Sequence, residues 1–319
     1  RALVSGATGF LGGHLAQVLH GLGYRVRILV HKRQRIEHLL ELGMEIVEGD
    51  LLDTASLMRA AAGQSVVFHT AGKVTDWGPR AEYFQVNTEG TRNVVAACRA
   101  NGVGFMDGTH FPHEPRTAQI RARIGANLGW PWSVASAFQF DLSDTSNIRL
   151  QPELEPYGAI GDTGWYNMRA AVEYTAPGVN IAAVDAYLRR HPETQAVVSA
   201  SGVIRFDDGS TSTFNCGFDS GAGVQDLRIT GTKAVTKLDD ILRSRRDDHT
   251  GVYEFRSGWD GRQQVEVPSA KPGAALMFED FAAMVGDPGR LEASIRASER
   301  TQQWLDAVWE SAVGNERGG

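Results

Sequence analysis

The sequence predicts an α/β protein with two domains: a doubly wound parallel sheet at the N-terminus, and a C-terminal α+β domain built on an open antiparallel sheet. Up to about residue 108, short apolar runs alternate with helical segments, as in parallel sheets whose crossovers are helices. After about residue 130, most segments alternate polar and apolar residues between turns, which is typical of antiparallel strands. We therefore expect domains at residues 1–108 and 109–319.

The first domain is expected to contain five strands and four helices. Its strands are predicted at residues 2–5, 25–30, 45–47, 65–71 and 104–106. Its helices are predicted from the first turn to about residue 19 and at residues 35–42, 54–62 and 81–100. Gly21, Gly43, Gly63 and Gly102 follow these helices, where a left-handed residue commonly ends a helix.

A glycine-rich turn joins the first strand to the first helix. Gly6, Gly9 and Gly12 have the spacing of a dinucleotide-binding turn. The first glycine permits the tight turn, the second lets the backbone approach a pyrophosphate, and the third allows close packing of strand and helix. Free N–H groups at the start of the helix attract the anion. This arrangement predicts a Rossmann domain, although a glycine-rich turn without a ligand is the structural alternative.

The end of the second strand carries cations where NAD-binding proteins usually carry an acid. His31, Lys32 and Arg33 follow Val30, and two of them could bind a 2′-phosphate. The sequence therefore favours NADP as the cofactor, with NAD possible. The alternative is a solvated basic stretch. A nucleic-acid surface is not expected, because no aromatic residues interleave with these charges.

Four segments of the first domain resemble the extended short-chain dehydrogenase/reductases, near the 3β-hydroxysteroid dehydrogenase and dihydroflavonol reductase branches. They are GATGFLG (6–12), GDLLD (49–53), VFHTAGKV (67–74) and NTEGT (87–91). The resemblance implies that the cofactor is bound by the loop, by the adenine position and by the strand that follows. These residues are Thr8, Phe10 and Leu11 in the loop, Asp50 and Leu51 by the adenine, and Thr70, Ala71 and Gly72 along the cofactor. That family's Tyr-x-x-x-Lys pair is absent from this chain.

The second domain is expected to be mostly β-structure between helices. A helix is predicted at residues 117–124, and others at 279–285 and 291–312. Strands are predicted at residues 133–140, 181–188, 202–206, 210–218, 225–230, 234–238, 253–256 and 263–267. Asp208-Gly209 predicts a hairpin turn between two of these strands.

This second part resembles the Gfo/Idh/MocA oxidoreductases, close to their dimeric dihydrodiol dehydrogenase-like branch. The similar segments are FMDGTHFPHEPRT (105–117), GAIGDTGWYNMRA (158–170), FNCGFDS (214–220) and SERTQQWLDAVWES (298–311). The resemblance implies reversible NAD(P)-linked oxidation of sugars, cyclitols or diols, with the large sheet often at an oligomer interface. We therefore expect a polyol or diol substrate and a homodimer.

Asp162 and Tyr166 lie four residues apart at the start of a predicted helix, so they share a face. Arg169 could join them. A carboxylate that holds a hydroxyl beside a phenol that transfers a proton suits hydride transfer at a carbinol carbon. In the family that the segment resembles, the equivalent residues help to bind substrate. Alternatively, Asp162 is an N-cap and Tyr166 a packing residue.

The second family's Glu-Lys-Pro lysine is also absent from its expected place, and Lys271-Pro272 lies far downstream. Lys73, which follows the fourth strand, is the nearest substitute, because a buried lysine can act as a base. It could equally be a solvated loop residue. His110 and His113 are weaker candidates. The two halves are expected to join at residues 97–103, as a natural or an engineered chimera.

Composition excludes several classes of protein. The net charge of −6 does not favour nucleic acid, and no apolar run is long enough to span a membrane. No metal is expected, because the nine histidines lack ligand spacing. Two cysteines favour a reduced, cytoplasmic setting. The sequence thus predicts an NAD(P)-dependent oxidoreductase, with a catalytically impaired NADP-binding protein as the alternative.

Overall fold

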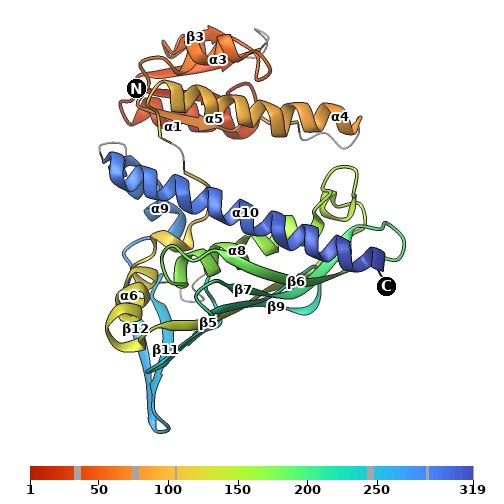
Figure 1. The fold of residues 1–319 in the computed structure, drawn as a ribbon. Coiled ribbons are helices and arrows are strands. Elements are labelled where there is room, and N and C mark those ends of the chain that lie inside the picture. Colours follow the sequence, from red (N-terminus) through yellow and green to blue (C-terminus); the bar gives the residue numbers. More distant parts are fainter. Residues whose placement is uncertain (32–36, 74–78, 105, 243–247, 285–286, 319) are drawn as a thin grey trace. The chain divides into compact units, whose positions relative to one another are not determined.

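The computed structural model describes residues 1–31, 37–73, 79–104, 106–242, 248–284 and 287–318. The chain forms two compact units (Figure 1). Unit 1 contains Arg1–Met106 and Ala283–Glu292, and unit 2 contains Asp107–Ala282 and Ala293–Gly319. Among the described residues, no helix combines the length and the apolar character needed to cross a bilayer.

Unit 1 is built on a four-stranded parallel sheet in the order β3-β2-β1-β4. The strands are β1 (Ala2–Ser5), β2 (Val26–Val30), β3 (Glu45–Glu48) and β4 (Val66–His69). The crossover helices are α1 (Phe10–Gly21), α2 (Glu37–Glu41) and α3 (Thr54–Ala61). The helix predicted at 81–100 forms as α4 (Arg80–Tyr83), a π-helical segment η1 (Phe84–Glu89) and α5 (Gly90–Ala100).

Helices cover both faces of this sheet, as the doubly wound pattern requires. Leu57 of α3 and Val94 of α5 pack with Leu3 of β1 in one buried cluster. Because side chains alternate along a strand, Val4 points to the opposite face. Val4 is fully buried, and Ala16 of the neighbouring α1 is buried as well. The predicted fold class of the first domain is confirmed.

The fifth strand predicted at residues 104–106 was wrong. Gly104 and Met106 belong to no strand, and residue 105 lies outside the described part of the chain. The backbone N–H of Val103 donates to the carbonyl of Cys98 at 2.8 Å, closing the end of α5. Gly104 then lies against the side chain of Leu291. This packing, which depends on a residue far along the chain, replaces pairing with β4.

Unit 2 contains an eight-stranded sheet in the order β12-β11-β10-β9-β5-β8-β7-β6. The strands are β5 (Pro131–Asp141), β6 (Ile181–Arg190), β7 (Val197–Phe206), β8 (Thr211–Gly217), β9 (Asp219–Gly231), β10 (Val235–Leu238), β11 (Gly251–Ser257) and β12 (Gly261–Val267). The pair β5–β8 is parallel, and the other described pairs are antiparallel. The predicted hairpin turn joins β7 to β8, with Gly209 at φ +87°.

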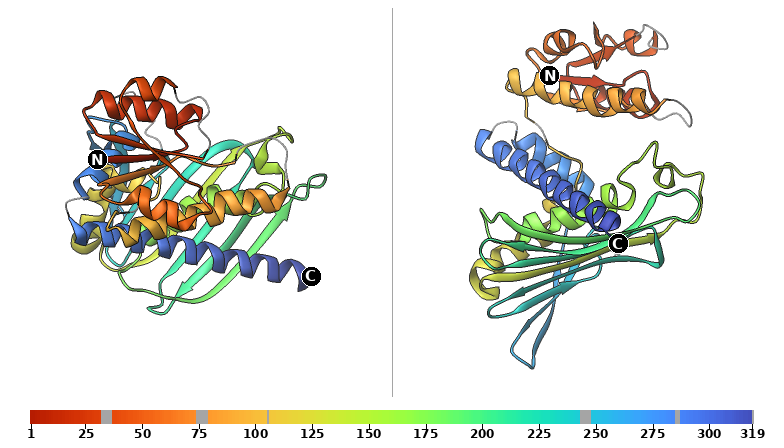
Figure 2. Two further views of the ribbon diagram at one scale, coloured as in Figure 1. Left: turned by 90° about the horizontal axis from the view of Figure 1, so that it is seen from above. Right: turned by 45° about the vertical axis from the view of Figure 1, so that its right-hand side comes forward.

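Helices lie on one face of this sheet, as the two views of Figure 2 show. They are α6 (Pro115–Arg123) with the π-helical η3 (Ile124–Leu128), α7 (Gly158–Gly161), α8 (Thr163–Tyr174), α9 (Gly273–Met284) and α10 (Pro288–Gly318). Two short 3₁₀ segments are η2 (Phe111–His113) and η4 (Ile148–Leu150). The open α+β sheet expected for the second domain is therefore present.

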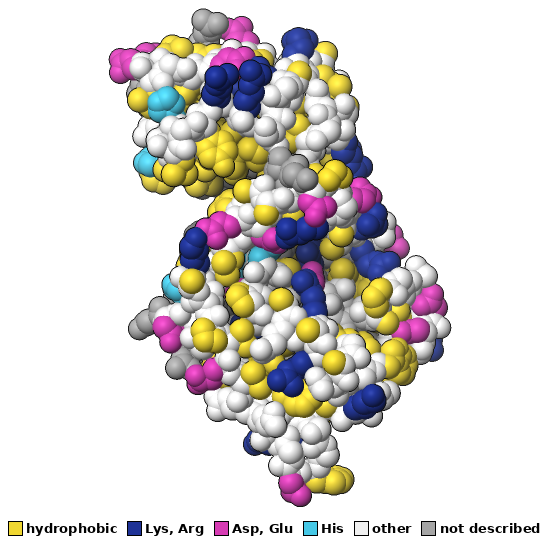
Figure 3. Space-filling model, turned by 90° about the vertical axis from the view of Figure 1, so that its left-hand side faces the viewer, with side chains coloured by type: hydrophobic (Ala, Val, Ile, Leu, Met, Phe, Trp, Pro, Cys, Tyr) yellow, Lys and Arg dark blue, Asp and Glu magenta, His cyan; other side chains and the backbone are white. Residues whose placement is uncertain are grey.

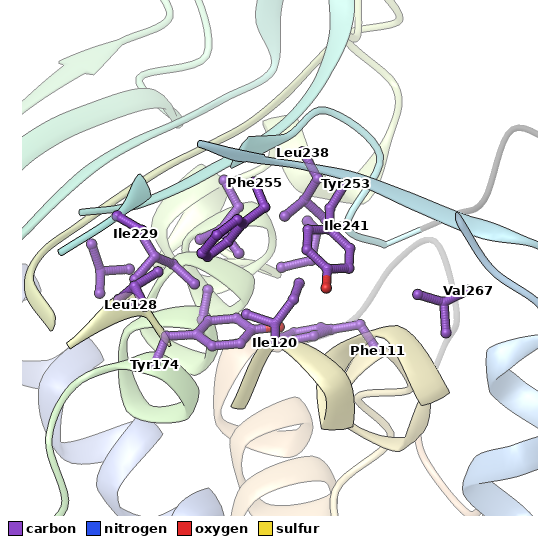
Figure 4. Packing of buried hydrophobic residues seen from close by; sticks show 14 of the residues in the cluster. Phe111, Ile120, Leu128, Tyr174, Ile229, Leu238, Ile241, Tyr253, Phe255 and Val267 are labelled. Atoms are coloured by element: carbon purple, nitrogen blue, oxygen red, sulfur yellow. The ribbon is translucent and has the colours of Figure 1, made fainter. Parts of the chain in front are cut away.

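Two buried clusters fix the helices of unit 2 to the sheet. In the first, Phe111, Ile120 and Tyr174 pack against Ile229 and Tyr253 (Figure 4). The second joins α8 and α10 to strands β6–β8. Together they hold α8, which carries Tyr166, as a rigid element against the sheet.

Candidate functional site

The glycine turn of unit 1 has no room for side chains at two positions. Gly6 has φ +74°, and a Cβ atom on it would lie 2.7 Å from the backbone nitrogen of Ala71. A Cβ atom on Gly12 would lie 2.3 Å from the carbonyl oxygen of Gly6 and 2.5 Å from Oγ1 of Thr70. Thr70 is itself fixed, because it donates to the carbonyl of Ser5 at 2.6 Å. The turn is therefore closed tightly onto the end of β4.

The first turn of α1 offers backbone donors at the surface. Gly9 is the N-cap, and no side chain caps the helix. Thr8 is exposed, and so are Phe10 and Leu11, with 85% and 67% of their surface accessible. Uncapped N–H groups at a helix start form an anion site. The free N–H groups at the start of α1 could therefore hold a pyrophosphate.

A carboxylate lies at the end of β2, although the sequence places none there. Nδ1 of His31 lies 3.2 Å from Oδ2 of Asp50, which follows the neighbouring strand β3. The other carboxylate oxygen of Asp50 accepts from the N–H of Leu52 at 2.9 Å. Leu51 is half-buried beside Gly90. Lys32 and Arg33, the predicted 2′-phosphate ligands, lie outside the described residues.

A half-buried histidine supports the end of β4, and sequence reasoning missed it. His69 hydrogen-bonds Ser5 Oγ through Nδ1 at 2.7 Å and Thr91 Oγ1 through Nε2 at 2.9 Å. The Thr91 hydroxyl gives its proton to the carbonyl of Asn87 at 2.7 Å. His69 therefore donates from Nε2, and burial lowers its pKa, so the ring is neutral. This chain of bonds orients the backbone that continues as Thr70, Ala71 and Gly72.

Lys73 is held by an acid rather than left free. Its Nζ forms an ion pair with Glu82 and lies 5.2 Å from the centre of the Tyr83 ring. Its backbone N–H donates to the side chain of Asn87 at 2.7 Å, and Asn87 donates back to its carbonyl at 3.0 Å. The amine is already bound by a carboxylate, so this arrangement does not favour Lys73 as a base.

In unit 2, Asp162 stands at the head of α8 beside an arginine. It is the N-cap residue, and its side chain does not cap the helix. Instead, Oδ2 accepts from Nε of Arg149 in η4. The carboxylate of Glu155 lies close by, and its pKa is raised by burial and by the charge of Asp162. Asp162 therefore occupies the N-cap position of the alternative reading, but its side chain binds Arg149 instead of capping the helix.

Tyr166 follows one turn later and is half-buried. Its ring packs edge-on against Phe138 of β5, with 6.1 Å between centroids. Burial raises its pKa, the charges of Asp162 and Asp107 raise it further, and that of Arg149 lowers it. Asp162 and Tyr166 thus lie one turn apart at the start of α8. The phenol is held in its protonated form near neutral pH, the form that can donate a proton.

Arg169 does not join Asp162. Its Nη1 donates to Oδ2 of Asp107 at 2.7 Å, and its Nε donates to Glu173 at 3.0 Å. Arg169 is almost fully buried, and the pKa of Asp107 is lowered because Arg169 and three hydrogen bonds outweigh its desolvation. The predicted third member of the site is therefore part of a supporting ion-pair network.

The two weaker candidates, His110 and His113, lie in different environments. Nδ1 of His113 pairs with Asp280 of α9 at 2.7 Å. Nδ1 of His110 is buried without a partner among the described residues, and burial lowers its pKa. No cluster of three or more potential metal ligands occurs in the described part of the chain.

Two family models match the two parts of the chain. Residues 2–108 match the NAD dependent epimerase/dehydratase family, and residues 118–237 match the GFO/IDH/MocA C-terminal domain. Both resemblances predicted from the sequence are confirmed. The expectation of a nicotinamide cofactor agrees with the description of the first family.

Curated relatives cover part of the chain. It is 39% identical over 112 residues to a 2-alkyl-3-oxoalkanoate reductase of Stenotrophomonas maltophilia, which is 35% of this chain and 33% of that protein. It is 40% identical over 111 residues to a 2-alkyl-3-oxoalkanoate reductase of Shewanella oneidensis, which is 35% of this chain and 28% of that protein. The chain thus spans about a third of the length of these relatives.

Solved structures share the fold over nearly the whole chain. A 3-ketoreductase of Actinomadura kijaniata, crystallised with NADP and TDP-benzene, superposes with a TM-score of 0.69 at 20% identity, covering 98% of this chain and 97% of the other. An aldose-aldose oxidoreductase of Caulobacter crescentus, complexed with glycerol, gives a TM-score of 0.67 at 13% identity with the same coverage. The two units thus have the two-domain fold seen in these oxidoreductases.

Proposed function

We propose that this protein is an NADP-dependent oxidoreductase that acts on a carbinol carbon of a polyol, sugar or diol. The observation that carries the proposal is the position of Asp162 and Tyr166 one turn apart at the head of α8, in a chain whose first unit has a tight glycine turn. Relatives and structural neighbours that bind NADP or reduce ketones support the same class of reaction. NAD remains the alternative cofactor.

In the proposed reaction, bound NADPH supplies a hydride to the carbonyl carbon. The Tyr166 phenol donates its proton to the carbonyl oxygen, and the tyrosinate regains a proton from solvent. In the oxidative direction the tyrosinate accepts the proton of the alcohol. Asp162, held by Arg149, accepts a hydrogen bond from a neighbouring substrate hydroxyl and orients it. Lys73 remains a candidate base that belongs to the other unit.

The test of this chemistry is a double variant, Asp162→Asn with Tyr166→Phe. NADPH oxidation with a panel of sugar and diol carbonyls should fall at least 100-fold, since general acid–base catalysis contributes about 10²–10⁴-fold. Asp144→Asn is the matched control, because Asp144 is an exposed carboxylate of the same unit. Unchanged turnover in the double variant would reject the proposed roles.

The cofactor is tested separately by titration with NADPH and NADH. Energy transfer from tryptophan to the nicotinamide reports binding. We expect tighter binding of NADPH, and a Lys32→Ala, Arg33→Ala variant should lose most of that preference because a 2′-phosphate would lose its cations. Equal affinity of the wild-type protein for both cofactors would contradict the assignment of NADP.

A second candidate is a protein that binds NADP without turnover. It is favoured by the ion pair between Lys73 and Glu82, which neutralises the nearest substitute for the missing lysine. This candidate predicts NADPH binding with no oxidation of NADPH by any carbonyl of the panel.

A further inference from the structure

The chain enters unit 2 through a short segment, Asp107–Thr109, that is bonded to α8. Unit 1 ends at Met106. Oδ1 of Asp107 accepts from the N–H of Thr109 at 2.9 Å. Oδ2 accepts from Arg169 of α8 at 2.7 Å and from the hydroxyl of Ser298 in α10. All the groups that contact this carboxylate therefore belong to unit 2.

A second bond joins the same segment to α8 on the other side of Tyr166. The indole N–H of Trp165 donates to Oγ1 of Thr109 at 2.8 Å. Thr109 is buried, with 3% of its surface accessible. Trp165 precedes Tyr166, and Arg169 follows it by three residues. The two bonds thus fix the turn of α8 that carries the phenol.

Arg169 cannot easily move away from this arrangement. Its second partner, Glu173, also pairs with Arg121 of α6. The side chains of Arg169 and Glu173 are 5% and 7% exposed. Because a buried ion pair that loses one partner leaves an uncompensated charge, the network favours a single position for this face of α8.

We propose that Asp107 and Thr109 are positioning residues for Tyr166, acting through Arg169 and Trp165. The inference rests on the proposed function, because it assigns Tyr166 the proton transfer. It adds that the segment leading from the nucleotide-binding unit fixes the orientation and the charge environment of the phenol.

The charges around Tyr166 give the proposal a measurable signature. Asp162 at the head of α8 and Asp107 on the entering segment disfavour the tyrosinate, whereas Arg149 of η4 favours it. Arg169 is balanced by Asp107 and Glu173. Replacing Asp107 by asparagine removes one repelling charge, which stabilises the tyrosinate.

The experiment is a pH titration of the full-length protein with tyrosine ring carbons labelled with ¹³C, the Tyr166 signal being assigned with Tyr166→Phe. In Asp107→Asn the Tyr166 titration should move to lower pH, and the alkaline limb of kcat should move with it. Asp107→Glu, which keeps the charge, should retain the wild-type titration, and Asp144→Asn should not move it. An unshifted Tyr166 titration in Asp107→Asn overturns the proposal.

A second pair of variants covers the case in which Asp107→Asn does not fold. Thr109→Val removes the acceptor of Trp165 with little change of volume, whereas Thr109→Ser keeps it. We expect a several-fold fall in kcat with an unchanged KM for valine, full rescue by serine, and a shifted Trp165 indole N–H resonance for valine alone. Equal behaviour of the two variants overturns the proposal.

These outcomes separate the inference from the proposed function. If the wild-type protein does not oxidise NADPH with any carbonyl, the proposed function fails. The ¹³C titration and the indole resonance need no turnover, so they still decide whether Asp107 and Thr109 control Tyr166.

Discussion

Gly12 carries the sharpest steric requirement of unit 1, because a Cβ atom would lie 2.3 Å from the carbonyl of Gly6. Gly12→Ala should therefore open the turn and weaken NADPH binding at least tenfold, as measured by fluorescence titration. Gly21→Ala in the same helix is the control, since a Cβ atom there meets nothing within 4 Å. It should leave affinity unchanged and raise stability by up to about 1 kcal/mol. Wild-type affinity in Gly12→Ala would show that the turn does not bind the cofactor.

Only local relationships at the site could be predicted from the sequence. The helical pattern was enough to place Asp162 and Tyr166 one turn apart at the start of a helix. The ion pairs around them could not be predicted from the sequence. Arg149 pairs with Asp162, and Asp107 pairs with Arg169, across intervening loops and strands. No periodicity relates such residues. The contact between His31 and Asp50 could not be predicted either, because Asp50 follows β3, the strand next to β2.

At the scale of elements, an arginine at the start of α6 pairs with two acids. Arg116 is 2% exposed and pairs with Asp240 and with Glu114, whose Oε2 lies 3.3 Å from Nη2. Burial raises the pKa of Glu114 from 4.5 to about 7, although Arg116 opposes this shift. Gly273, the first residue of α9, lies against the same carboxylate. The contact between α6 and α9 thus includes an acid that titrates near neutral pH.

This acid should make stability depend on pH. The folded protein holds the Glu114 proton more tightly than the unfolded chain does. The resulting stabilisation is complete below pH 4.5 and is lost as the pH rises through 7. Its upper limit is roughly 3 kcal/mol, at about 1.36 kcal/mol per pKa unit. Urea unfolding at pH 5 and pH 8 should show this loss in the wild type and not in Glu114→Gln. The exposed Glu153→Gln should behave as the wild type, and an identical pH dependence in Glu114→Gln would refute the assignment.

The order of elements was largely predictable because periodicity and turn chemistry are local. The strands of both sheets and the turn at Asp208-Gly209 were found in this way. The strand predicted at residues 104–106 does not form: Gly104 and Met106 lie in no strand, and Gly104 lies against Leu291. The parallel pair β5–β8 was also missed, since pairing between strands so far apart has no sequence signature.

At the scale of the molecule, each unit contains one buried cysteine. Burial raises the pKa of Cys98 in unit 1 to about 11 and that of Cys216 in unit 2 to about 12. At pH 8 the native thiols should therefore react at least about 100-fold more slowly than free cysteine. Labelling followed by mass spectrometry should modify Cys98 at lower urea concentration than Cys216, because unit 1 has the smaller sheet. Coincident labelling curves would mean that the units unfold together, and Cys98→Ser identifies the first signal.

The homodimer stays a prediction that sedimentation equilibrium can check. On the face seen in Figure 3, basic and acidic side chains are interspersed. Mixed charge of this kind is typical of ordinary protein surface and gives no indication of which face would be covered.

The return of the chain to unit 1 limits how genes for such proteins can recombine. Residues 283–292 belong to unit 1, although they are encoded after nearly all of unit 2, and Leu291 fills the space beside Gly104. A single crossover near residue 106 would exchange the first segment of unit 1, Gly104 included, but not this returning segment. A foreign nucleotide-binding half would be accepted only if it brought a residue as small as glycine to this contact. Gly104 and Leu291 must therefore match in size, and replacing both together is the direct way to graft a new first half onto this chain.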